Sequence, residues 1–148
     1  MSHAGASSTG SVLGVDVGTV RVGFAASDES GSLATPLAVL QRAGPGFWEE
    51  VQALVMQRSA RLAVVGLPRR ADGGEGEAAA MARSFAASFS QHTGCSVELW
   101  DERFTTQQAE RAMLSGGASR SKRRQRVDAV AAALLLQSWL DRSSAPRR

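Results

Sequence analysis

The stretch from Val12 to Ser27 constrains the fold more than any other part of the chain. It consists of two apolar runs that flank a single carboxylate, Asp16, with Gly18 and Thr19 shortly after it. The first run predicts a buried strand, the second predicts its partner, and Gly18-Thr19 predicts the turn between them. Asp16 is therefore expected at the carboxyl end of a central strand. An ionised carboxylate there needs a cation or a hydrogen-bond donor, unless it simply caps its own turn.

Length and composition are typical of one domain. The chain has 148 residues, of which 43% are hydrophobic, and we expect a single core over residues 11–142 with flexible tails at 1–10 and 143–148. Cys95 is the only cysteine, which excludes an intrachain disulfide and argues against a Cys-based zinc site. No apolar run approaches the ~20 residues of a membrane span, and the first ten residues do not resemble a signal peptide. These features predict a cytoplasmic protein with no membrane contact.

Hydrophobic periodicity predicts the order β-β-β-α-β-α-β-α-α. After the first two strands, the predicted elements are a strand at 33–40, a helix at 47–58, a strand at 61–66, a helix at 77–92, a strand at 96–100, a helix from Thr105 or Thr106 to about 114, and a helix at about 124–141. Right-handed crossovers place the fourth and fifth strands beside the first. We therefore predict an α/β fold with a five-stranded mixed sheet of order 3-2-1-4-5, in which strand 2 is antiparallel and helices flank the sheet.

Acidic residues are expected to meet at one edge of this sheet. Asp16 ends the first strand, Asp101 and Glu102 end the fifth, and Asp128 lies early in the last helix, where it can face the same edge. Carboxylates gathered in this way repel one another, and Mg²⁺ or Mn²⁺ with its preference for oxygen ligands relieves the repulsion. Two such ions ~3.5–4 Å apart could activate water and stabilise the leaving oxygen of a phosphodiester.

Basic residues are concentrated in one segment, although the net charge is only +3. The cluster consists of Arg120, Lys122, Arg123, Arg124 and Arg126. Cations at a helix N-terminus oppose the helix dipole, so this cluster favours nucleic-acid contact over a local stabilising role. Arg70, in a glycine-rich loop at 69–76, fits a phosphate contact. Arg21 and Arg103 fit either phosphate contacts or salt bridges.

Four stretches resemble the YqgF/RuvX family, the group of Holliday junction resolvases and pre-16S ribosomal RNA nucleases. They are GVDVGTVRVG at 14–23, VGLP at 65–68 with DG at 72–73, DERFTT at 101–106 and VDAVAAALLLQ at 127–137. They appear in family order and span nearly the whole chain. Any one of them is weak, but four in sequence are specific.

The resemblance implies an RNase H-like fold and metal-dependent cleavage of structured RNA or branched DNA. By motif position, Asp16, Glu102 and Asp128 match the catalytic, metal-binding carboxylates. Asp101 stays open as an alternative to Glu102, because strict alternation along the strand would separate the two but can fail at a strand end. Resolution of a junction would favour a symmetric dimer, and the sequence leaves monomer and homodimer open.

Two departures from the family pattern concern the site. Related resolvases often carry the second acid on the strand after the first helix, and here that strand ends in Gly66-Leu67-Pro68. Glu102 must therefore substitute from the neighbouring strand. Arg70 stands where the family's glycine-rich loop usually carries asparagine.

Two other functions compete with the nuclease. A non-catalytic nucleic-acid-binding factor in transcription or ribosome assembly would keep the basic segment and cleave nothing. A nucleotide phosphotransferase is suggested by Asp16-Val17-Gly18-Thr19, which resembles the phosphate loop of actin-like ATPases and sugar kinases. Those proteins need two such lobes, and this chain is long enough for only one.

Overall fold

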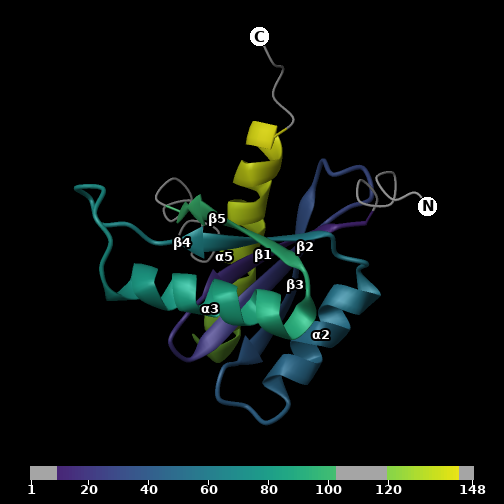
Figure 1. Cartoon of the computed structure of the whole chain (residues 1–148), viewed down its shortest axis with the longest axis horizontal. Coiled ribbons are helices and arrows are strands. Elements are labelled where there is room, and N and C mark those ends of the chain that lie inside the picture. Colours follow the sequence, from purple (N-terminus) through teal and green to yellow (C-terminus); the bar gives the residue numbers. More distant parts are fainter. Residues whose placement is uncertain (1–9, 103–119, 144–148) are drawn as a thin grey trace.

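The computed structural model describes residues 10–102 and 120–143 (Figure 1). Several predictions lie outside the described residues: Arg103, the helix expected at 105–114, and residues 1–9 and 144–148 of the predicted tails. The side chains of the basic cluster at 120–126 also lie outside what is described.

Five strands form one mixed sheet of order β3-β2-β1-β4-β5. Their bounds are β1 Val12–Val17, β2 Arg21–Ser27, β3 Ala34–Gln41, β4 Leu62–Leu67 and β5 Ser96–Asp101. β1 pairs in parallel with β4, and β4 pairs in parallel with β5. β2 is antiparallel to both β1 and β3. The predicted strand order and the antiparallel orientation of strand 2 are confirmed.

Pro36 lies on β3, the outer strand of the sheet. It is opposite Ala25, where the pairing of β2 with β3 shifts register after Phe24. Proline has no N–H to give to a ladder, so an edge strand at an irregularity is where a sheet tolerates it.

Three helices are described: α2 Phe47–Gln57, α3 Glu77–Thr93 and α5 Arg120–Ser143. α3 ends one residue after the predicted end at 92, where Gly94 adopts a left-handed conformation with φ of 73° and donates its N–H to the Ser90 carbonyl. α5 begins four residues before the predicted start at 124. Asp128 therefore lies about two turns into the helix and not near its beginning. Within the described ranges, no helix is both long enough and apolar enough to span a membrane.

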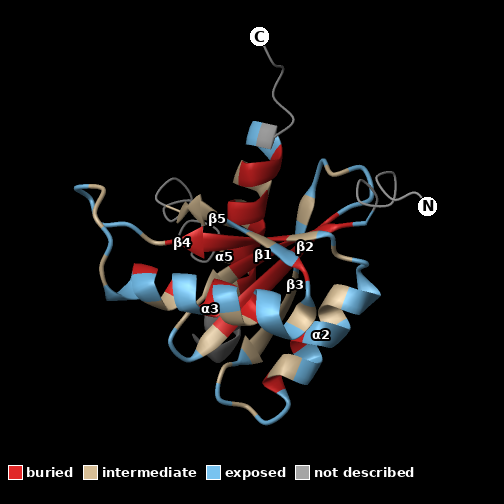
Figure 2. Cartoon of the chain, in the orientation of Figure 1, coloured by how far each residue is buried: buried red, intermediate tan, exposed pale blue. Residues whose placement is uncertain are grey.

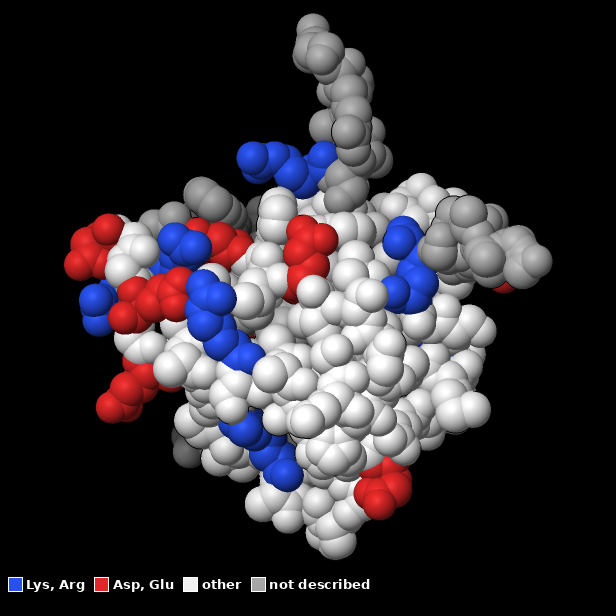
Figure 3. Space-filling view, in the orientation of Figure 1, with Lys and Arg blue, Asp and Glu red and all other residues white. Residues whose placement is uncertain are grey.

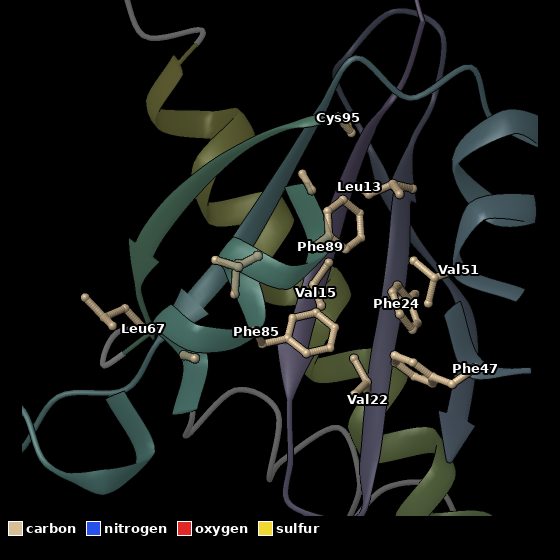
Figure 4. Close-up of a cluster of buried hydrophobic side chains, with 14 of the residues drawn as sticks. Leu13, Val15, Val22, Phe24, Phe47, Val51, Leu67, Phe85, Phe89 and Cys95 are labelled. Carbon is tan, nitrogen blue, oxygen red and sulfur yellow. The ribbon is translucent and has the colours of Figure 1, made fainter. Parts of the chain in front are cut away.

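The helices cover opposite faces of the sheet, with α2 and α3 on one face and α5 on the other (Figure 1). Figure 2 shows that the buried residues are concentrated in the central strands and in the side of α5 that faces them. The larger core, between the sheet and α2 with α3, includes Phe24, Phe85 and Phe89 (Figure 4). The smaller core lies under α5 and includes Val64, Leu136 and Trp139.

Candidate functional site

Strand alternation gives β1 two different faces. Leu13 and Val15 point into the larger core, whereas Gly14 and Asp16 lie on the α5 face. A Cβ at Gly14 would lie 2.7 Å from the carbonyl oxygen of Ala132 in α5. The helix backbone therefore packs directly on the bare backbone of this strand.

A second glycine brings Asp128 to Asp16. Gly23 of β2 pairs with Asp16 across the ladder, so both residues lie on the face that α5 covers. A Cβ at Gly23 would overlap the backbone carbonyl of Asp128. Because Gly23 has no side chain, the helix approaches closely at this point and Asp128 comes near enough to Asp16 to raise its pKa.

Glu102 reaches the same position from the end of β5. Its carboxyl group lies over Gly66 of β4, where a Cβ would overlap Oε2 of Glu102. Glu102 forms a side-chain hydrogen bond with Asp16. Asp101 instead has a carboxylate oxygen 3.8 Å from Nε of Arg69. The structure therefore places Glu102, rather than Asp101, against Asp16; which of them binds metal stays a prediction.

The contact between Asp16 and Glu102 changes the protonation of both groups. Burial, then the negative charge of Asp128, raises the pKa of Asp16 to about 6, although the hydrogen bond from Glu102 acts in the opposite direction. Burial, then the charge of Asp16 and their shared hydrogen bond, raises the pKa of Glu102 to about 7. A hydrogen bond between two carboxyl groups needs a proton on one of them, and Glu102 carries it because its pKa is higher.

These raised pKa values predict that, without divalent cations, stability falls as pH rises. The folded protein holds protons on Asp16 and Glu102 up to about pH 6 and 7, whereas the unfolded chain releases them near pH 4. The penalty is absent below pH 4 and complete above about pH 8. We expect Glu102→Gln to raise the free energy of unfolding by about 2 kcal/mol at pH 8 in EDTA.

The measurement is urea unfolding of the variant and the wild type at pH 4.5 and pH 8. The quantity compared is the difference between the two proteins, because Asp28 and Glu75 have lowered pKa values and shift the absolute profile in the opposite sense. An equal difference at both pH values would contradict the shared proton.

Asp128 has a cation as its partner. Nε of Arg21 donates to Oδ2 of Asp128 at 2.7 Å, and the two side chains are only 26% and 24% exposed. Of the two roles open for Arg21 from the sequence, the structure shows the salt bridge. A phosphate contact by this residue stays a prediction.

Arg70 lies in the loop between β4 and α3 and is 63% exposed, with Nε 3.7 Å from Oδ1 of Asp72. The loop is closed by its own backbone, since the N–H of Arg70 donates to the carbonyl of Gly74 at 2.8 Å. Figure 3 shows acidic and basic side chains side by side at this end of the molecule. The loop therefore exposes both signs of charge rather than a purely basic surface.

Sequence reasoning missed Arg42. Its backbone N–H donates to the carbonyl of Val20 at 2.8 Å, and Nη1 donates to the carbonyl of Gly18 at 3.2 Å. Gly18 in turn donates to the carbonyl of Arg21 at 2.9 Å. Arg42 thus fixes the turn that leads into Arg21, and only the pairing of β2 with β3 reveals it.

The donor set suits a hard cation, but three ligands are not arranged around one point. Among residues 10–102 and 120–143, no group of three His, Cys, Asp or Glu side chains is placed to hold a metal ion. Asp16 and Glu102 are in direct contact, and carboxylate oxygens are the ligands that Mg²⁺ and Mn²⁺ prefer. The pair therefore fits a divalent ion, while Asp128 is paired with Arg21.

Known proteins with a similar fold include two resolvases. A structure of "T. thermophilus RuvC in complex with Holliday junction substrate" matches with a TM-score of 0.57 and 16% identity, covering 91% of this chain and 97% of that one. The fowlpox virus resolvase in complex with Holliday junction DNA matches with a TM-score of 0.55 and 10% identity, covering 91% and 99%. At these identities the likeness establishes the RNase H-like fold.

Sequence relatives are closer. A protein of Pelotomaculum thermopropionicum named "Putative pre-16S rRNA nuclease" is 42% identical over 93% of this chain and 90% of its own length. A protein of the same name from Halalkalibacterium halodurans is 38% identical over 88% and 95%. The family model described as "RuvX: Holliday junction resolvase" matches residues 10–142. The chain therefore belongs to the RuvX family, and with it to nucleases of the resolvase type.

Proposed function

We propose that this protein is a divalent-metal-dependent nuclease that cleaves phosphodiester bonds in structured nucleic acid. The observation that carries the proposal is the buried contact between Asp16 and Glu102, with Asp128 beside Asp16. Burial and the negative charge of a neighbouring carboxylate raise the pKa of both groups, which is a cost to stability. Carboxyl groups whose pKa values are raised by burial and by a neighbouring charge are typical of catalytic centres.

Asp16 and Glu102 are the proposed ligands of the cation, and Asp128 completes the acidic site. Mg²⁺ or Mn²⁺ held there would supply positive charge to a phosphodiester and lower the pKa of bound water. The chain itself supplies the position: Asp16 is fixed by β1, and Glu102 is fixed over Gly66. Partial burial keeps the local dielectric low, so the charges of this site act strongly on a bound phosphate.

The proposed substrates are the 5′-extended precursor of 16S ribosomal RNA, a Holliday junction, or both. The names of the relatives support the RNA, whereas the description of the family supports the junction. Contacts to the backbone are assigned to Arg21, Arg70, Arg103, Lys122, Arg123, Arg124 and Arg126. Phosphate contacts position a nucleic acid without reading its sequence, which suits an enzyme that recognises structure.

The test is a cleavage assay on a four-way DNA junction and a 5′-extended precursor RNA in parallel. Each is incubated with Mg²⁺, with Mn²⁺ and with EDTA, and linear duplexes of equal length serve as controls. We expect cleavage of at least one structured substrate, in the presence of metal only. Binding that weakens steeply with salt, with no cleavage under any condition, would instead indicate a non-catalytic nucleic-acid-binding factor.

A further inference from the structure

Both the backbone and the side chain of Arg21 are held by hydrogen bonds. Its backbone carbonyl accepts a hydrogen bond from Gly18 at 2.9 Å, within the turn that Arg42 fixes. Its side chain lies on the α5 face of β2, two residues before Gly23, and donates to Asp128 at 2.7 Å. Because the Arg21 backbone is fixed by this turn and the guanidinium is a rigid planar group, little conformational freedom is lost when it contacts Asp128.

The charges around Asp16 balance with a single divalent ion. Fully ionised Asp16, Glu102 and Asp128 carry a charge of −3, and Arg21 contributes +1, which leaves −2. One divalent ion brings the total to zero. A second would leave +2 in a partly buried site, and an uncompensated charge is costly there.

The three carboxylates also fall into two groups, one that could bind an ion and one that is already paired. Asp16 and Glu102 contact each other, whereas an oxygen of Asp128 is occupied by Arg21. The absence of any three-ligand group in the described part of the chain fits this division. Asp16 thus has a second carboxyl group, Glu102, as one neighbour, whereas its other acidic neighbour, Asp128, already faces a protein cation.

We propose that Arg21 takes the place of a second metal ion, so that the protein without nucleic acid binds one divalent cation, held by Asp16 and Glu102. Arg21 is thus a positioning residue that controls the metal content of the site. The inference rests on the proposed function, because it assumes that the acidic site binds metal. The count applies before nucleic acid binds, since phosphates compete with carboxylates for guanidinium groups.

The experiment is a Mn²⁺ titration of the full chain at pH 7.5 without nucleic acid, with unbound Mn²⁺ measured by electron paramagnetic resonance. We expect one bound Mn²⁺ per chain for the wild type and two for Arg21→Gln, because the variant exposes Asp128 beside Asp16. Combining Arg21→Gln with Asp128→Asn is expected to restore a single ion. Circular dichroism establishes that each variant is folded.

Arg83→Gln is the matched control. Arg83 also forms an ion pair at 2.7 Å, with Glu75, but it lies on α3. This variant is expected to bind one Mn²⁺, as the wild type does. Two ions in the wild type, or one ion in folded Arg21→Gln, would overturn the inference and leave the nuclease proposal intact.

The single variant Asp128→Asn, which retains Arg21, tests the same inference. Its affinity for the single Mn²⁺ is expected to fall by no more than about 10–100-fold, the range for the loss of a supporting group. A larger fall would mean that Asp128 is a ligand of this ion and would overturn the inference. No Mn²⁺ binding by the wild type, or binding unchanged in Asp16→Asn, would overturn the metal site of the proposed function as well.

Discussion

Asp16→Asn is expected to lower the rate of metal-dependent cleavage by at least about 10³-fold. The proposed cation supplies several kcal/mol of transition-state stabilisation, and each 1.4 kcal/mol, approximately, is a factor of ten in rate. Asp16 is the only one of the three carboxylates that contacts or adjoins both others, so an amide there removes the group around which the site is built. The measurement is single-turnover cleavage at saturating Mn²⁺.

The same variant is expected to fold and to bind nucleic acid at least as well as the wild type. Asparagine preserves the shape of the side chain and removes a negative charge that burial makes costly. Asp101→Asn is the matched control, because it neutralises a carboxylate at the same edge whose partner is Arg69. A cleavage rate for Asp16→Asn equal to that of Asp101→Asn would contradict the assignment.

The sheet could be predicted from the sequence because its signals are local. The apolar runs around Asp16 predict an antiparallel pair, and the later strands are joined by helices whose crossovers have a fixed hand. The position of Asp16 at the end of β1 follows directly. The sequence left the choice between Asp101 and Glu102 open, because alternation can fail at a strand end, and the structure gives the two carboxylates different partners.

Contacts between distant segments could not be predicted in the same way. The start of α5 lies four residues before the predicted start at 124, although a run of Arg and Lys at a helix N-terminus opposes the dipole. The high helix propensity of these residues explains why the helix nevertheless extends back to Arg120. The salt bridge from Arg21 to Asp128 joins residues 107 positions apart, and it depends on how α5 lies on the sheet.

The missing acid at the end of β4 also has a structural meaning that the sequence alone does not give. In the sequence, the strand that ends in Gly66-Leu67-Pro68 lacks the acidic residue that related resolvases often carry there. In the structure, the bare backbone of Gly66 provides the space that the carboxyl group of Glu102 occupies. The sheet register connects these observations, because Gly66 pairs with Trp100, which precedes Glu102 by two residues in the chain.

Gly23→Ala is expected to lower the free energy of unfolding by about 2–3 kcal/mol, the upper range for overpacking a tight contact. A Cβ at this position would overlap the backbone carbonyl of Asp128 and lie 3.1 Å from the backbone nitrogen of Ala129. Neither atom belongs to a side chain that can rotate away. Relief therefore requires movement of α5 or of β2.

That movement should also reduce cleavage by about 10²-fold, since a displacement near 1 Å is enough for such a loss. Gly31→Ala is the control, because Gly31 has φ of 73° and nothing within 4 Å of its added Cβ. Gly31→Ala is expected to lower the free energy of unfolding by about 1–2 kcal/mol through backbone strain alone and to leave cleavage unchanged. Denaturant unfolding and single-turnover cleavage measure the two effects. Gly23→Ala with wild-type values for both would show that α5 does not hold Asp128 against β2 as closely as described.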